Sequence, residues 1–308
     1  MIPMLKRFLS YVEIKTKITS IFPFLMTLAY LILNGKEIDS LRTAIFFCGM
    51  FLFDLTATTI NNYSDTKKNH QTLQFPRRTA LLMTAVLFLI SAALGVYLVS
   101  LTDIVVLLAG GLCFFFGVIY SWGPVPLSHG PFGEVASGFF YGVLIPFIVY
   151  YINDPADLFT YSLSYEKIAA EINVAPVIGL LLLSVLPFCL TANIMLANNI
   201  CDVAHDVEVH RYTLAFYLKK YALYLFAFLY VAAYASVIVM VVSGFLSPLS
   251  LLLLITLIPV RKNITVFFKK QVKEETFNVS IKNFVLIIAG HIILIAAGCL
   301  LPGWGPAY

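Results

Sequence analysis

The dominant pattern along the chain is a series of long apolar runs separated by polar segments rich in Gly, Pro, Asn and charged residues. Each run has close to the 20 residues that an α-helix needs to cross a hydrocarbon core of about 30 Å. The strands of a membrane barrel would instead alternate in polarity over about ten residues. The pattern predicts about nine membrane-spanning helices, at residues 18–34, 43–60, 79–101, 103–121, 134–152, 175–199, 220–243, 245–260 and 283–301.

The distribution of basic residues supports this number of spans and orients them. With a cytoplasmic N-terminus, 17 of the 20 Lys and Arg residues fall in cytoplasmic segments, and only Lys36, Arg42 and Lys167 fall outside. Short loops rich in Lys and Arg stay on the cytoplasmic side of a membrane. Because one extra or missing helix would scramble this bias, we expect a multi-pass membrane protein with a cytoplasmic N-terminus.

Composition excludes several other classes of protein. Hydrophobic residues make up 60% of the 308 residues and charged residues only 12%, against about 25% charged residues in soluble domains. The net charge of +4 forms no basic stripe of the kind that binds nucleic acid. The five cysteines lack the spacing of a metal site or a disulfide framework. We expect one all-α membrane domain over residues 1–308.

A polar motif occurs twice, each time at the end of a predicted span. Residues 61–69 read NNYSDTKKN and residues 198–206 read NNICDVAHD, so both match N-N-x-x-D-x-x-x-[N/D]. The copies are 137 residues and four spans apart, which places both on the cytoplasmic side. The repeat predicts two pseudo-repeated four-helix halves, each of which presents one motif.

The spacing within the motif predicts a site for a divalent cation and a diphosphate. Residues four apart share a helix face, and Mg²⁺ prefers oxygen ligands from carboxylates and substrate phosphates. Helix capping also explains Asn and Asp at helix ends, but it gives no reason for a repeat of four spaced positions. The candidate metal ligands are Asn61, Asp65, Asn69, Asp202 and Asp206. The candidate substrate contacts beside them are Asn62, Lys67, Lys68, Asn198 and Arg211.

Two further features lie near the motifs. Asp54 precedes Asn61 by seven residues and should face a cavity, either as a substrate contact or as a structural partner, because an ionisable group inside a membrane is costly. Residues 120–134, YSWGPVPLSHGPFGE, hold three prolines and three glycines. This segment either caps the polar chamber, with Tyr120 lining the substrate, or forms a rigid turn.

These motifs resemble the UbiA superfamily of intramembrane prenyltransferases. The segments NNICDVAHDVEVHRYTLAFYL and YSWGPVPLSHGPFGEVASG are similar to its menaquinone branch, and the resemblance extends from about Glu13 to Leu301. It implies transfer of a polyprenyl chain from a prenyl diphosphate to the aromatic acid 1,4-dihydroxy-2-naphthoate. The acid would lose its carboxylate and give demethylmenaquinone, in a reaction that depends on Mg²⁺ in the plasma membrane of a bacterium.

The resemblance also implies roles for individual residues. Asp65, Asp202 and Asp206 would be catalytic, as holders of the Mg²⁺ that neutralises the departing diphosphate. Lys67, Lys68 and Arg211 would add positive charge at the same place. Lys15 or Lys17 would hold the carboxylate of the acceptor, or would serve only as a topology signal.

The first motif departs from the family pattern. Asn62 stands where the family usually has Asp, and Asn69 and Gln71 occupy the positions of its last Asp, so Asp65 is the one carboxylate left. His210 replaces a usual glycine. Fewer charged ligands weaken metal binding. Three alternatives therefore stay open: another acceptor such as 4-hydroxybenzoate, a prenyl-lipid-binding protein without activity, and a transporter, whose site would lie nearer the bilayer midplane.

Overall fold

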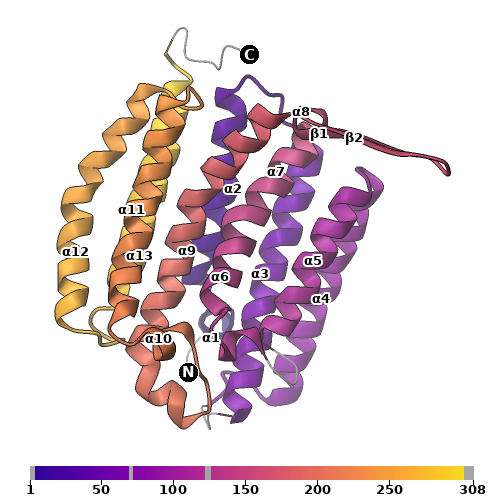
Figure 1. Ribbon diagram of the computed structural model, residues 1–308. Coiled ribbons are helices and arrows are strands. Elements are labelled where there is room, and N and C mark those ends of the chain that lie inside the picture. The colour runs from indigo at the N-terminus through magenta and orange to yellow at the C-terminus, as the bar shows by residue number, and fades with distance from the viewer. Residues whose placement is uncertain (1–3, 69–71, 122–125, 302–308) are drawn as a thin grey trace.

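The computed structural model describes residues 4–68, 72–121 and 126–301. Its long helices run side by side and form one bundle (Figure 1). The α-helices are α1 (Met4–Tyr11), α2 (Ile18–Leu33), α3 (Ser40–Lys68), α4 (Arg77–Ser100), α5 (Ile104–Ser121), α6 (Gly133–Phe139), α7 (Ile145–Asn153), α8 (Pro155–Leu158), α9 (Val174–Glu208), α10 (Leu214–Leu218), α11 (Tyr221–Val242), α12 (Leu257–Lys269) and α13 (Asn278–Gly298).

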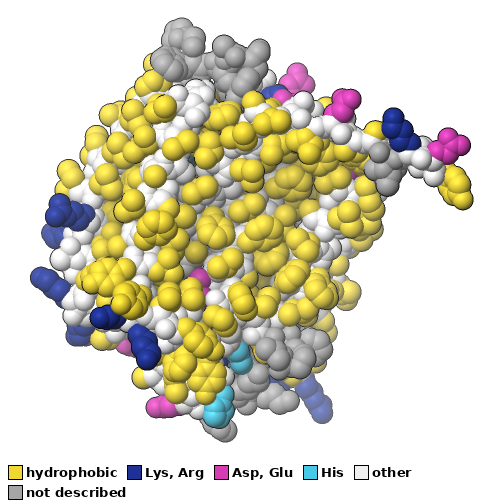
Figure 2. All heavy atoms as spheres, viewed as in Figure 1, with side chains coloured by type: hydrophobic (Ala, Val, Ile, Leu, Met, Phe, Trp, Pro, Cys, Tyr) yellow, Lys and Arg dark blue, Asp and Glu magenta, His cyan; other side chains and the backbone are white. Residues whose placement is uncertain are grey.

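The expected membrane helices are confirmed. Within the described residues, eight helical segments are long and apolar enough to cross a membrane, and the apolar helix at Ile104–Tyr120 is shorter. One of the eight joins α6 to α7 through the π-helical turn η3 (Phe140–Leu144). Another joins the 3₁₀ helix η4 (Pro248–Thr256) to α12. Apolar side chains cover most of the face seen in Figure 2, as a surface in contact with lipid requires.

The two helices that carry the motifs are longer than the sequence pattern predicted. The apolar runs end near residues 60 and 199, whereas α3 continues to Lys68 and α9 to Glu208. Neither extension contains the Pro or Gly that would stop a helix. Both motifs are therefore helical where the structure describes them, so residues spaced by four lie on one side of each helix.

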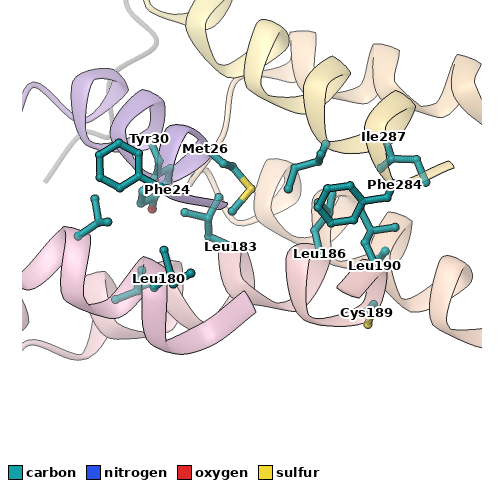
Figure 3. Close-up of a cluster of buried hydrophobic side chains, with 14 of the residues drawn as sticks. Phe24, Met26, Tyr30, Leu180, Leu183, Leu186, Cys189, Leu190, Phe284 and Ile287 are labelled. Carbon is teal, nitrogen blue, oxygen red and sulfur yellow. The ribbon is translucent and has the colours of Figure 1, made fainter. Parts of the chain in front are cut away.

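The packing of α9 against its neighbours positions the second motif. Leu183, Leu186 and Leu190 of α9 are almost fully buried where α9 meets Met26 of α2 and Phe284 of α13 (Figure 3). On another side, a Cβ added to Gly142 would lie 2.2 Å from the backbone nitrogen of Phe188. Only glycine permits this approach of two backbones, so the turn η3 packs directly on α9.

The segment between α7 and α9 contains a β-hairpin that sequence reasoning did not predict. The antiparallel strands β1 (Phe159–Leu163) and β2 (Ile168–Ile172) pair Phe159 with Ile172 and Tyr161 with Ala170. The hairpin projects sideways from the bundle in Figure 1. It is a small addition to an otherwise helical fold, and the all-α class holds.

Candidate active site

Both motifs line one cavity. The cavity has a volume of about 780 Å³ and is lined by Asn61 and Asn62 of α3 and by Asn198, Asp202 and Asp206 of α9. Positions 137 residues apart in the sequence therefore share one polar chamber near the ends of two helices. The structure brings these five candidate residues together.

The two carboxylates of α9 each lie beside a basic side chain. Asp202 forms an ion pair with Lys273, from the segment between α12 and α13. The Nε of Arg211 lies 3.5 Å from Oδ1 of Asp206. The other oxygen of Asp206, Oδ2, is buried and has no hydrogen-bond partner among the described residues. Because a buried carboxylate oxygen without a partner is costly, this oxygen is suited to a ligand that the protein itself does not supply.

The first motif is described in part. The backbone of Asp65, Lys67 and Lys68 belongs to α3, but the side chains of these three residues lie outside the described part of the structure, as does Asn69. Among the described residues no three His, Cys, Asp or Glu side chains form a metal-binding group. Asn61, Asn198, Asp202 and Asp206 nevertheless line one cavity, and their carboxylate and amide groups carry the hard oxygen donors that suit Mg²⁺.

The asparagine that departs from the family pattern has a structural partner. The amide Nδ2 of Asn62 donates a hydrogen bond of 2.9 Å to the backbone oxygen of Tyr11, at the end of α1. An ionised aspartate cannot donate this bond. Asn62 thus ties the N-terminal helix to α3 while it also lines the cavity.

We expect the substitution Asn62→Asp to release α1 from the bundle. The change removes the donor and turns a carboxylate oxygen toward the Tyr11 carbonyl, so the free energy of unfolding should fall by about 1–3 kcal/mol. Limited proteolysis in detergent should then cleave the region around residues 4–13 faster than in the unaltered protein. The matched control is Asn61→Asp, which adds the same charge one residue away. Equal cleavage of both variants would contradict the anchoring role.

A buried ion pair forms another part of the cavity wall. Lys17 and Asp54 are 2% and 5% exposed, and the Lys17 Nζ lies 2.9 Å from Oδ1 of Asp54. Ser20 donates to Oδ2 of Asp54 at 2.6 Å, and Tyr141 donates to Oδ1 at 2.8 Å. Asp54 therefore faces the cavity, as expected, and is held by structural partners. Lys15, in contrast, is exposed and is not among the residues that line the cavity.

The first turn of α6 and the segment that precedes it are hydrogen-bonded to the second motif and to Arg211, which follows the motif. Asn199 donates to Oε1 of Glu134 at 2.8 Å, and both residues are 2% exposed. Arg211 Nη2 donates to the Ser128 carbonyl at 3.2 Å. Ser128 itself lines the cavity. The described part of this segment thus forms one side of the chamber. It is more than the rigid turn that its Pro and Gly residues alone would explain.

Tyr120 lies in the cavity wall, where the sequence had suggested it. Its hydroxyl accepts a hydrogen bond from Ser137 at 3.3 Å and lies 3.6 Å from the sulfur of Met195. Two further cavity residues, His205 and Lys273, were missed as site residues. His205 falls within the second motif but off its four-residue spacing, and in the sequence Lys273 is one of the 17 basic residues that only orient the spans.

Comparisons with known proteins agree with this geometry. The model of the UbiA prenyltransferase family matches residues 20–279. A curated relative, the 1,4-dihydroxy-2-naphthoate octaprenyltransferase of Bacillus subtilis (strain 168), is 29% identical over 172 residues, which cover 56% of this chain and 49% of the relative. The match therefore spans about half the length of that relative.

Two solved structures show the same fold. One, from a study of digeranylgeranylglyceryl phosphate synthase in membranes, has a TM-score of 0.64 and 18% identity and covers 96% of this chain and 98% of its own. The other is a UbiA homologue from Archaeoglobus fulgidus bound to GPP and Mg²⁺, with a TM-score of 0.63 and 12% identity, covering 96% and 100%. At these identities the likeness concerns the fold, which confirms the expected bundle.

Proposed function

The chain belongs to the UbiA prenyltransferase family, and on that premise we propose that it transfers a polyprenyl group from a prenyl diphosphate to 1,4-dihydroxy-2-naphthoate. The observation that carries the proposal is the shared cavity of the two Asn/Asp motifs, Asn61–Asn62 and Asn198–Asp206. The naphthoate acceptor is supported by the Bacillus subtilis relative and by the resemblance of the second motif to the menaquinone branch.

The polar end of the cavity is suited to a diphosphate held with Mg²⁺. Asp202 and Asp206, with the amide oxygens of Asn61 and Asn198, would hold the metal. Asp65, Lys67, Lys68 and Asn69 of the first motif stay sequence-based candidates for contacts to the metal and the diphosphate. When bound, Mg²⁺ supplies the positive charge that stabilises the departing diphosphate. Arg211 and Lys273 bring further positive charge to the same end.

The remaining residues of the cavity serve the organic part of the reaction. The bond between the allylic carbon and the diphosphate oxygen breaks, and the diphosphate takes the bonding electrons. Phe53, Phe114 and Phe140 line the cavity and would shield the resulting cation from water, while Tyr120 offers an aromatic face to it. The ring carbon that bears the carboxylate then bonds to the cation. The bond from this carbon to the carboxylate breaks, its electrons restore the aromatic ring, and CO₂ leaves.

The proposal also includes the setting of the enzyme. Lys and Arg are concentrated in the loops on the side of the bundle where the motifs are expected. This excess supports an orientation in the cell membrane in which both motifs face the cytoplasm. A cavity next to the lipid suits a donor whose tail is insoluble in water and whose diphosphate is soluble.

The test is an assay of the purified protein in lipid nanodiscs with octaprenyl diphosphate, Mg²⁺ and 1,4-dihydroxy-2-naphthoate. We expect a prenylated and decarboxylated naphthalenediol in the lipid extract, detected by its mass, and no product after chelation of Mg²⁺. A parallel reaction contains 4-hydroxybenzoate instead of the naphthoate. Product from 4-hydroxybenzoate alone would overturn the naphthoate assignment, and no product from either acid would overturn the proposed activity.

A further inference from the structure

The β-hairpin lies at the end of the bundle opposite the motifs. Strand β2 ends at Ile172 and α9 begins at Val174, so the hairpin adjoins the end of α9 that is farthest from the second motif. From there it projects sideways, past the neighbouring helices (Figure 1). An isolated hairpin of two strands is marginally stable at best in water. A surface that covers one of its faces would therefore stabilise it.

The register of the two strands separates apolar from polar side chains. Successive residues of a strand point to opposite faces, and directly paired residues point to the same face. The apolar face holds two described pairs, Phe159 with Ile172 and Tyr161 with Ala170. The polar face holds the pairs Thr160 with Glu171 and Ser162 with Ala169. The hairpin is thus amphipathic in the way expected of a strand pair at a boundary between lipid and water.

Contacts with the bundle show which way the apolar face is turned. The ring of Phe159 lies 5.3 Å from the ring of Tyr151 near the end of α7 and 6.5 Å from the ring of Tyr161. Tyr161 in turn forms a hydrogen bond with Asp103, the residue immediately before α5. Since Tyr151 and Asp103 both lie at helix ends of the bundle, the apolar face is turned toward the level of the membrane, and the polar face is turned away.

The apolar face continues the surface that the bundle presents to lipid. Phe159 and Ile172 close one end of an apolar groove of about 340 Å³ between α7 and α9, with Phe147 and the 55% exposed Leu181 among its lining. Of the residues that line the groove, only Ser184 is polar, and its hydroxyl donates to a backbone oxygen of its own helix. Both helices belong to segments that can cross a membrane. The groove is therefore suited to hydrocarbon and joins the hairpin to the apolar surface seen in Figure 2.

The tip of the hairpin has the side chains of a membrane interface. Tyr165 is fully exposed in the turn, and Glu166 and Lys167 beside it are also exposed. Tyrosine is concentrated where a bilayer meets water, because its ring is apolar and its hydroxyl is polar. The tip is thus suited to the layer of lipid head groups.

We propose that the hairpin lies flat on the bilayer, with its apolar face on the leaflet at the end of the bundle opposite the motifs. Acyl chains of this leaflet fill the groove beneath Phe159 and Ile172, while the polar face and the charged tip stay in contact with water and head groups. A leaflet is favoured over a second copy of the chain because it already covers the helices that continue the same apolar surface. This binding surface does not depend on the reaction that the enzyme catalyses.

Two tryptophan variants measure which face of the hairpin meets lipid. Ala170→Trp and Ala169→Trp make the same change on neighbouring residues of opposite faces, and both also carry Trp122→Phe and Trp304→Phe, which remove the two tryptophans of the chain. Each variant is placed as a single copy in nanodiscs whose lipids carry bromine near the glycerol end of the acyl chains. We expect bromine to quench Ala170→Trp at least about threefold more strongly, because strand alternation holds position 169 away from lipid. Acrylamide, which quenches from water, should show the reverse order.

The same measurement identifies the other possible partners of the face. Equal quenching of the two variants by the brominated lipids would overturn the proposal, as would stronger quenching of Ala169→Trp. In nanodiscs that hold two copies, shielding of Ala170→Trp from both reagents would overturn the lipid assignment in favour of a second copy.

Proteolysis tests the same contact in a chain that keeps its tryptophans. Ala170→Glu places a charge on the apolar face, which a lipid surface disfavours, so cleavage by trypsin after the exposed Lys167 should become about threefold faster or more. Ala169→Glu makes the same change on the polar face and should leave the rate within about twofold of the unaltered protein. Equal acceleration in the two variants would contradict the lipid contact.

Discussion

Replacing Asp202 with asparagine is expected to lower the rate of prenyl transfer by about 10²- to 10³-fold, the usual loss when one group that stabilises a transition-state charge is removed. Asp202 lines the polar end of the cavity and pairs with Lys273. The asparagine side chain has nearly the size of aspartate and keeps one oxygen that can coordinate a metal. It lacks the negative charge that helps to hold a divalent cation. The Mg²⁺ concentration for half-maximal activity should rise accordingly, because the charge of the ligands tunes metal affinity.

The control for Asp202→Asn is Glu208→Gln, the same chemical change on the same helix. The Glu208 side chain is 77% exposed and does not line the cavity, so this variant should retain activity within about twofold, as surface substitutions usually do. Initial rates are measured over a Mg²⁺ titration in identical nanodiscs. Comparable activity and Mg²⁺ dependence in the two variants would show that Asp202 has no part in the reaction.

The helical bundle and the meeting of the two motifs could be predicted because both depend on short-range patterns. The length of an apolar run is set by the thickness of the bilayer, and charge bias then fixes which ends share a side. Positions four apart, such as Asp202 and Asp206, share a helix face wherever the helix lies. No knowledge of tertiary packing is needed for these inferences, and the cavity unites the predicted pair Asn61 and Asn198.

The partners of the charged groups could not be predicted, because they depend on how distant segments pack. Lys17 and Asp54 stand 37 residues apart, and nothing in the local sequence distinguishes Lys17 from Lys15 as the partner. Lys273 reaches Asp202 from a segment 71 residues away. The helix ends at Lys68 and Glu208 were missed for a different reason, since the hydropathy of a run indicates where lipid ends and not where a helix ends.

Asn62 shows how a departure from a family pattern can have a local explanation. From the sequence alone, the exchange of Asp for Asn suggested a weaker metal site. In the structure, Asn62 donates to the Tyr11 carbonyl, a bond that only the amide can make. The exchange therefore gives α1 an attachment to α3, and it is not by itself a sign of lost activity.

The substitution Lys17→Met should have the largest effect on stability. It would leave the Asp54 carboxylate, which is 5% exposed, without its ammonium partner in the bundle interior. Removing one member of a buried ion pair typically lowers the free energy of unfolding by about 3–5 kcal/mol. The measurement is an unfolding titration in mixed micelles, with Lys15→Met as the matched control. Lys15 is exposed and belongs to the same segment, so its loss should cost less than about 0.5 kcal/mol.

A double variant tells whether the cost comes from the unpaired charge or from the other hydrogen bonds that Lys17 makes. In Lys17→Met with Asp54→Asn no buried charge remains, and the amide oxygen can still accept a hydrogen bond from Ser20 or Tyr141, which now donate to the carboxylate. Replacing both members of a buried pair often costs little, so the double variant should be more stable than Lys17→Met alone. If it is less stable, the effects of the two changes add, and Lys17 contributes through its hydrogen bonds to the Asp54 backbone oxygen and the Thr58 hydroxyl and not through the charge of Asp54. A single variant with unaltered stability would mean that water reaches Asp54 from the cavity and solvates its charge, which would make this carboxylate available to substrate.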